Sequence, residues 1–352
     1  MKKEAFVLTF GVVLISIVAG LGMVINAQRR TSVRLGKPAQ IQAGEYRLSG
    51  PFTHNNLSIF LVHGKNMFPQ GKVFLTLQEA MVQKKVVVYE TKSVNELSIQ
   101  NLGDDDVYVQ AGDIVKGGQQ DRMIGVDLIV PRKSGKMPIS AFCVEQGRWS
   151  GRGNEQARVF SSSSDVVATK EIKLAAKRGN SQGGVWQSVA EAQDKLSQNV
   201  GVRVNSPVSA SSLQLAVENT KVRESADSYI KALSNIVNSR SDVIGYVFAI
   251  NGKVNSADVY GSNALFKKLW PKLLKANAIE AIAELQQDKF DAPKPEHART
   301  FLSEGEKAQA SEKPVSARVG LVTAEDDKNI FFETRDRANK DAWIHRNYIK
   351  KN

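Results

Sequence analysis

Short runs of apolar residues, separated by turn-forming residues, fill the chain between Ser58 and Glu145. Runs of this length that are rich in β-branched and aromatic residues are typical of strands. They lie at residues 57–62, 86–91, 94–99, 108–111, 124–130 and 139–145, and a further short strand is expected within 41–48. Because these strands follow one another closely, the pattern favours an antiparallel sheet or a sandwich in this part of the chain.

One short helix is predicted among these strands, at residues 76–85. Thr76 is followed three positions later by Glu79, which is the sequence of a capping box. Lys84 and Lys85 then supply the positive charge that favours the C-terminal end of a helix.

Helical periodicity replaces the strand pattern in the second half of the chain. It predicts helices within residues 185–200, 211–237 and 263–285, and strands at 243–250, 254–260, 317–323 and 330–334. Asn251-Gly252, between two of these strands, favours the positive φ angles of a tight hairpin turn. We therefore expect an α+β fold, with a β-rich antiparallel N-terminal half and the helices of the C-terminal half packed on it.

Two segments show neither the pattern of strands nor the periodicity of helices. Residues 150–180 are rich in Gly, Ser, Arg and Lys and are predicted to be a mobile loop, and the proline-containing segment 292–314 is predicted to be a surface loop. The expected organisation is a β-rich part over residues 28–149 and an α/β part over residues 181–352 that completes one domain and ends in a basic tail.

The N-terminus has the pattern of a targeting segment. Lys2 and Lys3 precede an uncharged stretch from Ala5 to Ile25, which is long for a signal core and just long enough to span a bilayer. We expect residues 1–27 to be a signal peptide or an uncleaved membrane anchor through residues 5–25. The protein is then exported, to the periplasm or the extracellular space, or anchored in a membrane.

The charge balance is basic, with 48 Lys and Arg against 36 Asp and Glu and a net charge of +12. An anionic partner fits this charge, but so does simple solubility, because the basic residues are spread along the chain. A nucleic acid is not expected as a partner. Cys143 is the single cysteine, so a disulfide framework is excluded, and the four histidines lack metal-ligand spacing. We predict no metal site and no cofactor.

The first motif is Gly117-Gly118-Gln119-Gln120-Asp121-Arg122. Backbone without Cβ atoms can approach a ligand closely or form an anion-binding nest of N–H groups. In an extended strand Asp121 and Arg122 point to opposite faces, and Gln120 shares a face with Arg122. Arg122 needs a carboxylate or phosphate partner. That partner is either a ligand or an internal carboxylate such as Glu145 or Asp113.

The second motif is Glu145-Gln146-Gly147-Arg148-Trp149, at the end of an apolar strand. Gly147 permits a sharp turn, and Arg148 with Trp149 can form a platform for ring stacking or for an anion. Trp149 is alternatively a plug at the end of a sheet.

Together these motifs resemble a bacterial and archaeal domain family, the ARG and rhodanese-phosphatase-superfamily-associated protein domain. The resemblance is carried by Val94-Asn-Glu-Leu97, Asn101-Leu-Gly-Asp104, Gly112-Asp113, the first motif, Pro138-Ile139, Cys143-Val144-Glu145, Gly147-Arg148-Trp149, Gly245-Tyr-Val-Phe-Ala-Ile-Asn-Gly252 and the segment around Trp270. The family is named for genomic neighbours that include ADP-ribosylglycohydrolase-type enzymes. The resemblance implies a link to ADP-ribose or to phosphorylated metabolites.

Three hypotheses for function follow. The first is a binding module in which Gly117, Gly118, Gln120, Arg122, Arg148 and Trp149 hold an anionic ligand such as a nucleotide or a sugar phosphate. The second is a hydrolase in which Glu145 or Asp121 is the general base. The third is a structural envelope protein in which the motifs form an internal network. The sequence leaves open whether the protein is an enzyme.

Overall fold

The computed structural model describes residues 37–68 and 73–351, and residues 162–167 are described by their backbone alone. The predicted signal peptide or anchor at residues 1–27 lies outside the described residues. Within the described ranges, no helix is both long enough and apolar enough to cross a membrane.

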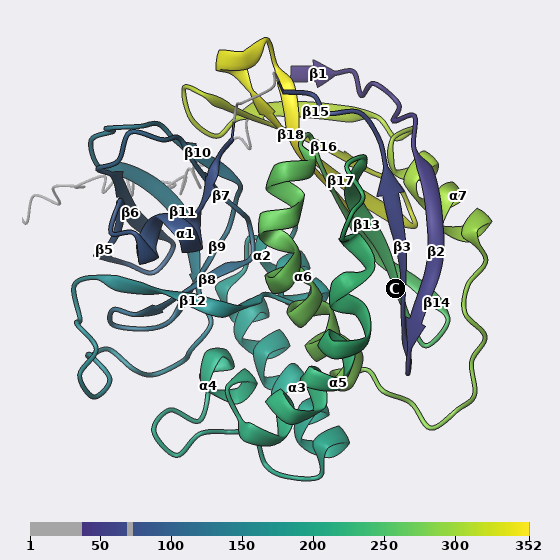
Figure 1. The fold of residues 1–352 in the computed structure, drawn as a ribbon. Coiled ribbons are helices and arrows are strands. Elements are labelled where there is room, and N and C mark those ends of the chain that lie inside the picture. Colours follow the sequence, from purple (N-terminus) through teal and green to yellow (C-terminus); the bar gives the residue numbers. More distant parts are fainter. Residues whose placement is uncertain (1–36, 69–72, 352) are drawn as a thin grey trace, which may run out of the picture. The chain divides into compact units, whose positions relative to one another are not determined.

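The largest element is a nine-stranded sheet with the strand order β1-β15-β16-β17-β18-β14-β13-β3-β2, in which every neighbouring pair is antiparallel (Figure 1). Its strands are β1 (Lys37–Ala39), β2 (Arg47–His54), β3 (Leu57–His63), β13 (Val243–Ile250), β14 (Lys253–Tyr260), β15 (Ala310–Pro314), β16 (Val319–Glu325), β17 (Asn329–Asp336) and β18 (Ala342–Lys350). The hairpin predicted at Asn251-Gly252 joins β13 to β14, and both turn residues have positive φ.

Two smaller sheets form the other β region. The six-stranded sheet has the order β12-β8-β9-β11-β6-β5, and the three-stranded sheet has the order β10-β7-β4. Their strands are β4 (Leu75–Thr76), β5 (Val86–Ser93), β6 (Glu96–Asn101), β7 (Val107–Val109), β8 (Asp113–Gly117), β9 (Arg122–Ile124), β10 (Leu128–Val130), β11 (Met137–Cys143) and β12 (Phe160–Val167). The β4–β7 pair is parallel.

The helices pack against strands of all three sheets, and both faces of the large sheet are covered. They are α1 (Leu77–Val82), α2 (Lys170–Lys177), α3 (Gln182–Val200), α4 (Leu213–Val217), α5 (Thr220–Leu233), α6 (Asn263–Ala283) and α7 (Pro295–Gly305), with the 3-10 turns η1 (Ser234–Val237) and η2 (Arg337–Asn339). Helix α6 lies between the two β regions and contacts β12 and β4 as well as β13 and β14 (Figure 1). Phe301 of α7 packs with Phe60 and Phe331 on the opposite face of the sheet. Burial of such a side chain stabilises the fold by about 1.5–3 kcal/mol.

The fold is mixed α+β with large antiparallel sheets, as expected. The expected division into a β-rich first half and a helical second half is only partly visible, because the nine-stranded sheet combines strands from both ends of the described chain. The capping box of α1 is confirmed, since the Glu79 N–H donates to the Thr76 hydroxyl and the Thr76 N–H donates to the Glu79 carboxylate.

Several local predictions are wrong. The segment 150–180 contains β12 and α2, and the segment 292–314 contains α7 and β15. The expected helix over 211–237 is broken, because the Asn219 side chain accepts a hydrogen bond from the Lys221 N–H and starts a new helix there. The strand expected over 124–130 is divided into β9 and β10. The expected basic tail contains β18.

Candidate functional site

The first motif forms the turn between the antiparallel strands β8 and β9. Gly117 and Gly118 have φ angles of +108° and +56°, which favour glycine. A Cβ atom on Gly118 would lie 2.3 Å from Cζ of the Phe160 ring. The turn therefore needs glycine at position 118 for space as well as for backbone conformation.

Two carboxylates from the two motifs lie next to this turn. Asp121 and Glu145 have no exposed surface. Asp121 accepts hydrogen bonds from the Gly117 N–H (2.9 Å) and from the Ser212 hydroxyl (2.9 Å), and its own backbone N–H donates to Glu145 Oε2 (2.9 Å). The two motifs, 24 residues apart at these positions, are therefore in direct contact.

The segment that follows Glu145, residues 146–159, covers these carboxylates and is called the cover loop here. Its Arg148 donates to both Glu145 oxygens (2.8 and 2.7 Å) and to the carbonyl oxygens of Gly117 and Gly118 (both 3.1 Å). Its Arg152 donates to both Asp121 oxygens (both 3.1 Å) and to Glu145 (3.4 Å). Gly117, Gly118, Asp121, Glu145, Arg148, Arg152 and Ser212 are together called the motif cluster.

Electrostatics distinguish the two carboxylates. Burial, together with the neighbouring charge of Glu145, raises the pKa of Asp121. Burial also opposes ionisation of Glu145, but hydrogen bonds, that from Arg148 foremost, bring its pKa below the ordinary value. Arg152 contacts both carboxylates, and together with Arg148, which pairs with Glu145, it compensates their buried charge.

Arg122 points away from the motif cluster, as the strand alternation requires. Its guanidinium donates to Glu90 (3.3 Å), to the Val94 carbonyl oxygen (2.7 Å) and to Cys143 Sγ (2.9 Å). The internal partners considered from the sequence, Glu145 and Asp113, are wrong, because the partner is Glu90. Arg122 has no exposed surface, so a ligand would have to displace packed side chains to reach it.

The other two predicted residues lie in contrasting environments. Gln120 has no exposed surface, and both polar atoms of its amide lack a hydrogen-bond partner among the described residues. Trp149 is 51% exposed on the cover loop and does not plug the end of a sheet. Of the eight residues predicted as site residues, Gly117, Gly118, Asp121, Glu145 and Arg148 meet in one cluster, whereas Arg122 belongs to a separate network.

A second buried polar group was not predicted. His345 on β18 lies between two carboxylates, with Nδ1 2.8 Å from Asp127 Oδ2 and Nε2 2.9 Å from Asp258 Oδ1. Asp127 also accepts from the Thr334 hydroxyl (2.7 Å), and the Tyr260 ring stacks on the imidazole at 4.6 Å between centroids. The available signal was the presence of Asp127 and Asp258, each a single charged residue between two apolar neighbours.

Lys177 of α2 lies beside this group. Its Nζ donates to Asn347 Oδ1 (3.2 Å) and lies 3.9 Å from the centre of the Phe332 ring. Burial lowers the pKa of Lys177 to about 8, although the charge of Asp127 opposes this change. Perturbed groups of this kind occur at functional sites and also in structural ion-pair networks.

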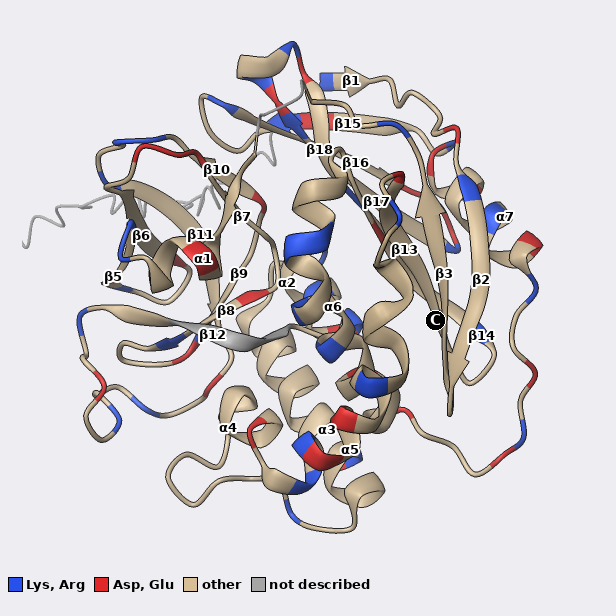
Figure 2. Ribbon diagram, viewed as in Figure 1, with Lys and Arg blue, Asp and Glu red and all other residues tan. Residues whose placement is uncertain are grey.

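Lys and Arg are interspersed with Asp and Glu over the ribbon (Figure 2). In the described part of the chain, no group of three or more His, Cys, Asp or Glu residues is arranged to hold a metal ion. The contacts described above make the motif cluster a set of paired charges, in which amide, hydroxyl and guanidinium groups donate hydrogen bonds to two carboxylates.

Comparison with known proteins gives one match. The sequence model of the ARG and Rhodanese-Phosphatase-superfamily-associated Protein domain matches residues 45–349. No curated protein and no solved structure matches the chain. The matched range contains both motifs, and of the strands in the described part of the chain all but β1 begin within it. The chain therefore belongs to the ARG and Rhodanese-Phosphatase-superfamily-associated Protein domain family.

Proposed function

We propose that the chain is a binding module whose ligand site is the motif cluster, entered when the cover loop moves. The observation that supports this proposal most is that two arginines of the motif cluster belong to one segment. Arg148 and Arg152 both come from the cover loop, and both contact carboxylates that belong to the body of the fold. Movement of one segment would therefore release two guanidiniums and two carboxylates together.

The cover loop is loosely packed around Gly147 and Gly153, although a Cβ on Gly151 would lie 2.6 Å from the Glu155 carbonyl oxygen. Gly147 and Gly153 have φ angles of +86° and +55°, and no atom lies within 4 Å of the position that a Cβ would take on either residue. Arg158 at the far end has an exposed side chain, and its carbonyl oxygen accepts from the Glu90 N–H (3.0 Å). Segments with few buried contacts open at low free-energy cost, so the cost of opening this loop is set mainly by the ion pairs of Arg148 and Arg152.

The proposed ligand is an anionic small molecule, such as an ADP-ribose-like or phosphorylated metabolite. In the closed arrangement Arg148 and Arg152 are paired with Asp121, Glu145 and Glu155, so an anion gains contacts only when the guanidiniums leave these carboxylates. In the closed arrangement burial and the charge of Glu145 raise the pKa of Asp121, and Arg152 opposes this rise.

A structural role is the second candidate, and a specific observation favours it. Asp121 and Glu145 are fully buried and already hold their hydrogen bonds within the chain. Such a network can fix the register of β8 and β9 without any ligand. In the third candidate, hydrolysis, Glu145 or Asp121 accepts a proton from water, which requires the same loop movement to admit that water.

A thermal-shift screen of the full-length chain tests these candidates. The ligands are nucleotides, ADP-ribose, sugar phosphates and their unphosphorylated parents, and the proteins are the wild type, Arg148→Ala, Arg152→Ala and the exposed control Arg158→Ala. A ligand at a hundred times its dissociation constant adds about 2.7 kcal/mol of stability. Binding that is lost in the first two variants and kept in the control supports the module.

The remaining outcomes separate the alternatives. No shift with any ligand, together with strong destabilisation by both cluster substitutions, would favour the structural role. Turnover of a bound compound that is abolished in Glu145→Gln, while its binding is kept, would favour the hydrolase.

A further inference from the structure

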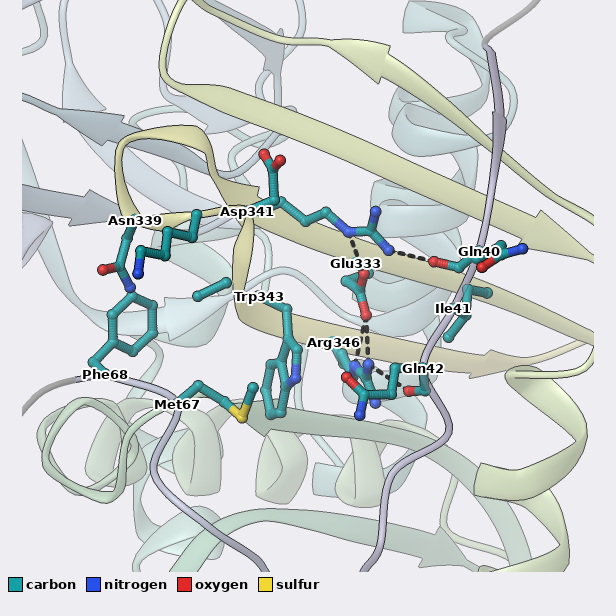
Figure 3. Close-up of a pocket in the computed structure, with 13 residues that line it drawn as sticks. Gln40, Ile41, Gln42, Met67, Phe68, Glu333, Asn339, Asp341, Trp343 and Arg346 are labelled. Atoms are coloured by element: carbon teal, nitrogen blue, oxygen red, sulfur yellow. Dashed lines mark hydrogen bonds and ion pairs between the residues drawn. The ribbon is translucent and has the colours of Figure 1, made fainter.

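A hollow of about 990 Å³ opens on the nine-stranded sheet, away from the motif cluster. Its walls are the segment Gln40–Gln42, which precedes β2, the residues Met67 and Phe68, which follow β3, and strands β17 and β18 with the turn between them (Figure 3). A volume of this size is within the range of small-molecule sites.

The arginines in the floor of the hollow form their hydrogen bonds and ion pairs with other groups of the protein. Glu333 accepts from Arg335 (2.6 Å) and from Arg346 (2.7 Å). The same two arginines donate to the carbonyl oxygens of Gln40 (2.7 Å) and Gln42 (2.8 Å), so they hold the wall of the hollow in place. Figure 3 shows these contacts as a continuous row across the floor.

The charges around the floor also balance. The surrounding guanidiniums and carboxylates form a closed set of ion pairs, in which each Arg is matched by a Glu. The set consists of Arg335, Arg337, Arg346, Glu306, Glu312 and Glu333. At the rim, Lys340 and Asp341 are adjacent, exposed and opposite in charge. An ionic ligand therefore finds no excess of counter-charge in the hollow.

The remaining lining is aromatic and neutral polar. The Trp343 ring has the Arg346 guanidinium 4.5 Å from its centre, which fixes the ring in place, and Met67 beside it is 38% exposed. The amide side chains of Gln40, Gln42 and Asn339 belong to the same lining. An amide donates and accepts at once, as a hydroxyl group does.

From this combination we propose that the hollow is a binding site for a neutral, hydroxyl-rich ligand of the saccharide class. The amides exchange hydrogen bonds with ligand hydroxyls, and the C–H face of a sugar ring packs on Met67 and on the edges of Trp343 and Phe68, which are each 8% exposed. Ion pairing contributes nothing to this recognition, so a phosphate group on the ligand gives no added affinity.

The test uses the full-length chain and isothermal titration calorimetry with a panel of neutral mono- and oligosaccharides, N-acetylated sugars, their phosphates and inorganic phosphate. We expect saturable binding of at least one neutral saccharide, with a phosphate derivative that binds no tighter. Gln40→Ala and Gln42→Ala remove exposed amide side chains at the rim and should leave the melting temperature unchanged while weakening binding about fivefold each, as expected for one lost hydrogen bond. Trp343→Phe should weaken it further.

Two controls place the binding in the hollow. Lys253→Ala, exposed in the β13–β14 hairpin, and Arg158→Ala, exposed on the cover loop, should both bind the saccharide like the wild type. The motif-cluster proposal is tested with phosphorylated ligands and with other variants, so its failure and the failure of this one give different results. The proposal is overturned if no neutral saccharide binds, if the phosphates bind more tightly than their parents, or if the two rim variants bind like the wild type.

Discussion

The Nδ1 atom of His345 lies 2.8 Å from a carboxylate oxygen of Asp127, and its other ring nitrogen lies 2.9 Å from Asp258. An ionised carboxylate only accepts hydrogen bonds, so both imidazole nitrogens must donate and the ring is positively charged. Asp127 lies between β9 and β10, whereas His345 and Asp258 belong to the nine-stranded sheet. The imidazolium therefore joins the two β regions through a buried charge.

We expect the free energy of unfolding to fall as the pH rises above 6.5. Burial works against the charge, but Asp127 and Asp258 outweigh it and raise the pKa of His345. A raised pKa contributes stability that is fully present below the pKa of the unfolded state and is lost as the pH rises through that of the folded state. At the acidic end, Asp258, whose pKa is lowered to about 2, contributes stability that is lost as the pH falls through that value.

Urea unfolding of the wild type and of His345→Gln between pH 5 and pH 9 measures this effect. The variant leaves two buried carboxylates without their cation and should lose about 3–5 kcal/mol at pH 6. The difference between the two proteins should shrink as the pH rises. A difference that stays constant over this range would show that His345 is neutral in the folded protein.

Arg152→Ala should destabilise the protein far more than Arg158→Ala. Arg152 donates to both oxygens of the buried Asp121, whereas Arg148 is paired with Glu145 and lies 3.6 Å from Asp121. Removal of Arg152 therefore breaks the main ion pair of Asp121, and loss of one partner of a buried pair costs about 3–5 kcal/mol. The Arg158 side chain is exposed, and such substitutions change stability by about 0.5 kcal/mol or less. Chemical denaturation measures both. Equal effects would mean that the contacts of Arg152 do not hold in solution.

Gly118→Ala and Gly153→Ala form a matched pair, because the φ angles are +56° and +55°. A Cβ on Gly153 meets nothing within 4 Å. This substitution should therefore lower the free energy of unfolding by only about 1 kcal/mol, the cost of placing a residue with a Cβ at a positive φ angle. A Cβ on Gly118 meets the Phe160 ring, and overpacking should add about 1–3 kcal/mol. The difference between the two denaturation midpoints isolates the steric cost, and a zero difference would mean that β12 moves freely away from the turn.

Cys143 should not react with thiol reagents in the folded protein. Burial raises the pKa of its thiol to about 11, so about one molecule in a thousand is a thiolate at pH 8, compared with about a quarter for a free cysteine. Because Cys143 is the single cysteine, labelling measured by mass spectrometry reports this position alone. Labelling should become complete in urea, and rapid labelling without denaturant would contradict the buried contact with Arg122.

The sequence correctly predicted structural features that depend on residues close together in the chain. The Asn251-Gly252 hairpin and the Thr76–Glu79 capping box are local interactions, and both are present in the structure. The opposite directions predicted for Asp121 and Arg122 are confirmed by their different partners, although Asp121 lies just before β9 and not within it.

Predictions failed where the partner is distant in sequence. Asp127 and His345 are 218 residues apart, and nothing in either strand indicates the other. Residues 150–180 have the composition of a loop, yet β12 is ordered by pairing with β8, and α2 packs against α3. Arg152 was missed as a site residue because it lies in this segment.

The position of β18 has a consequence for how the chain acquires its structure. Residues 342–350 lie between β14 and β17, so the nine-stranded sheet stays divided until this late segment has been synthesised. Similarly, β3 cannot form its pairing with β13 until β13 has been synthesised, and β13 begins 180 residues after β3 ends. Topologies with such high contact order fold slowly, and they leave unpaired strand edges exposed in the meantime. The newly made chain should therefore depend on protection from aggregation until β18 is available.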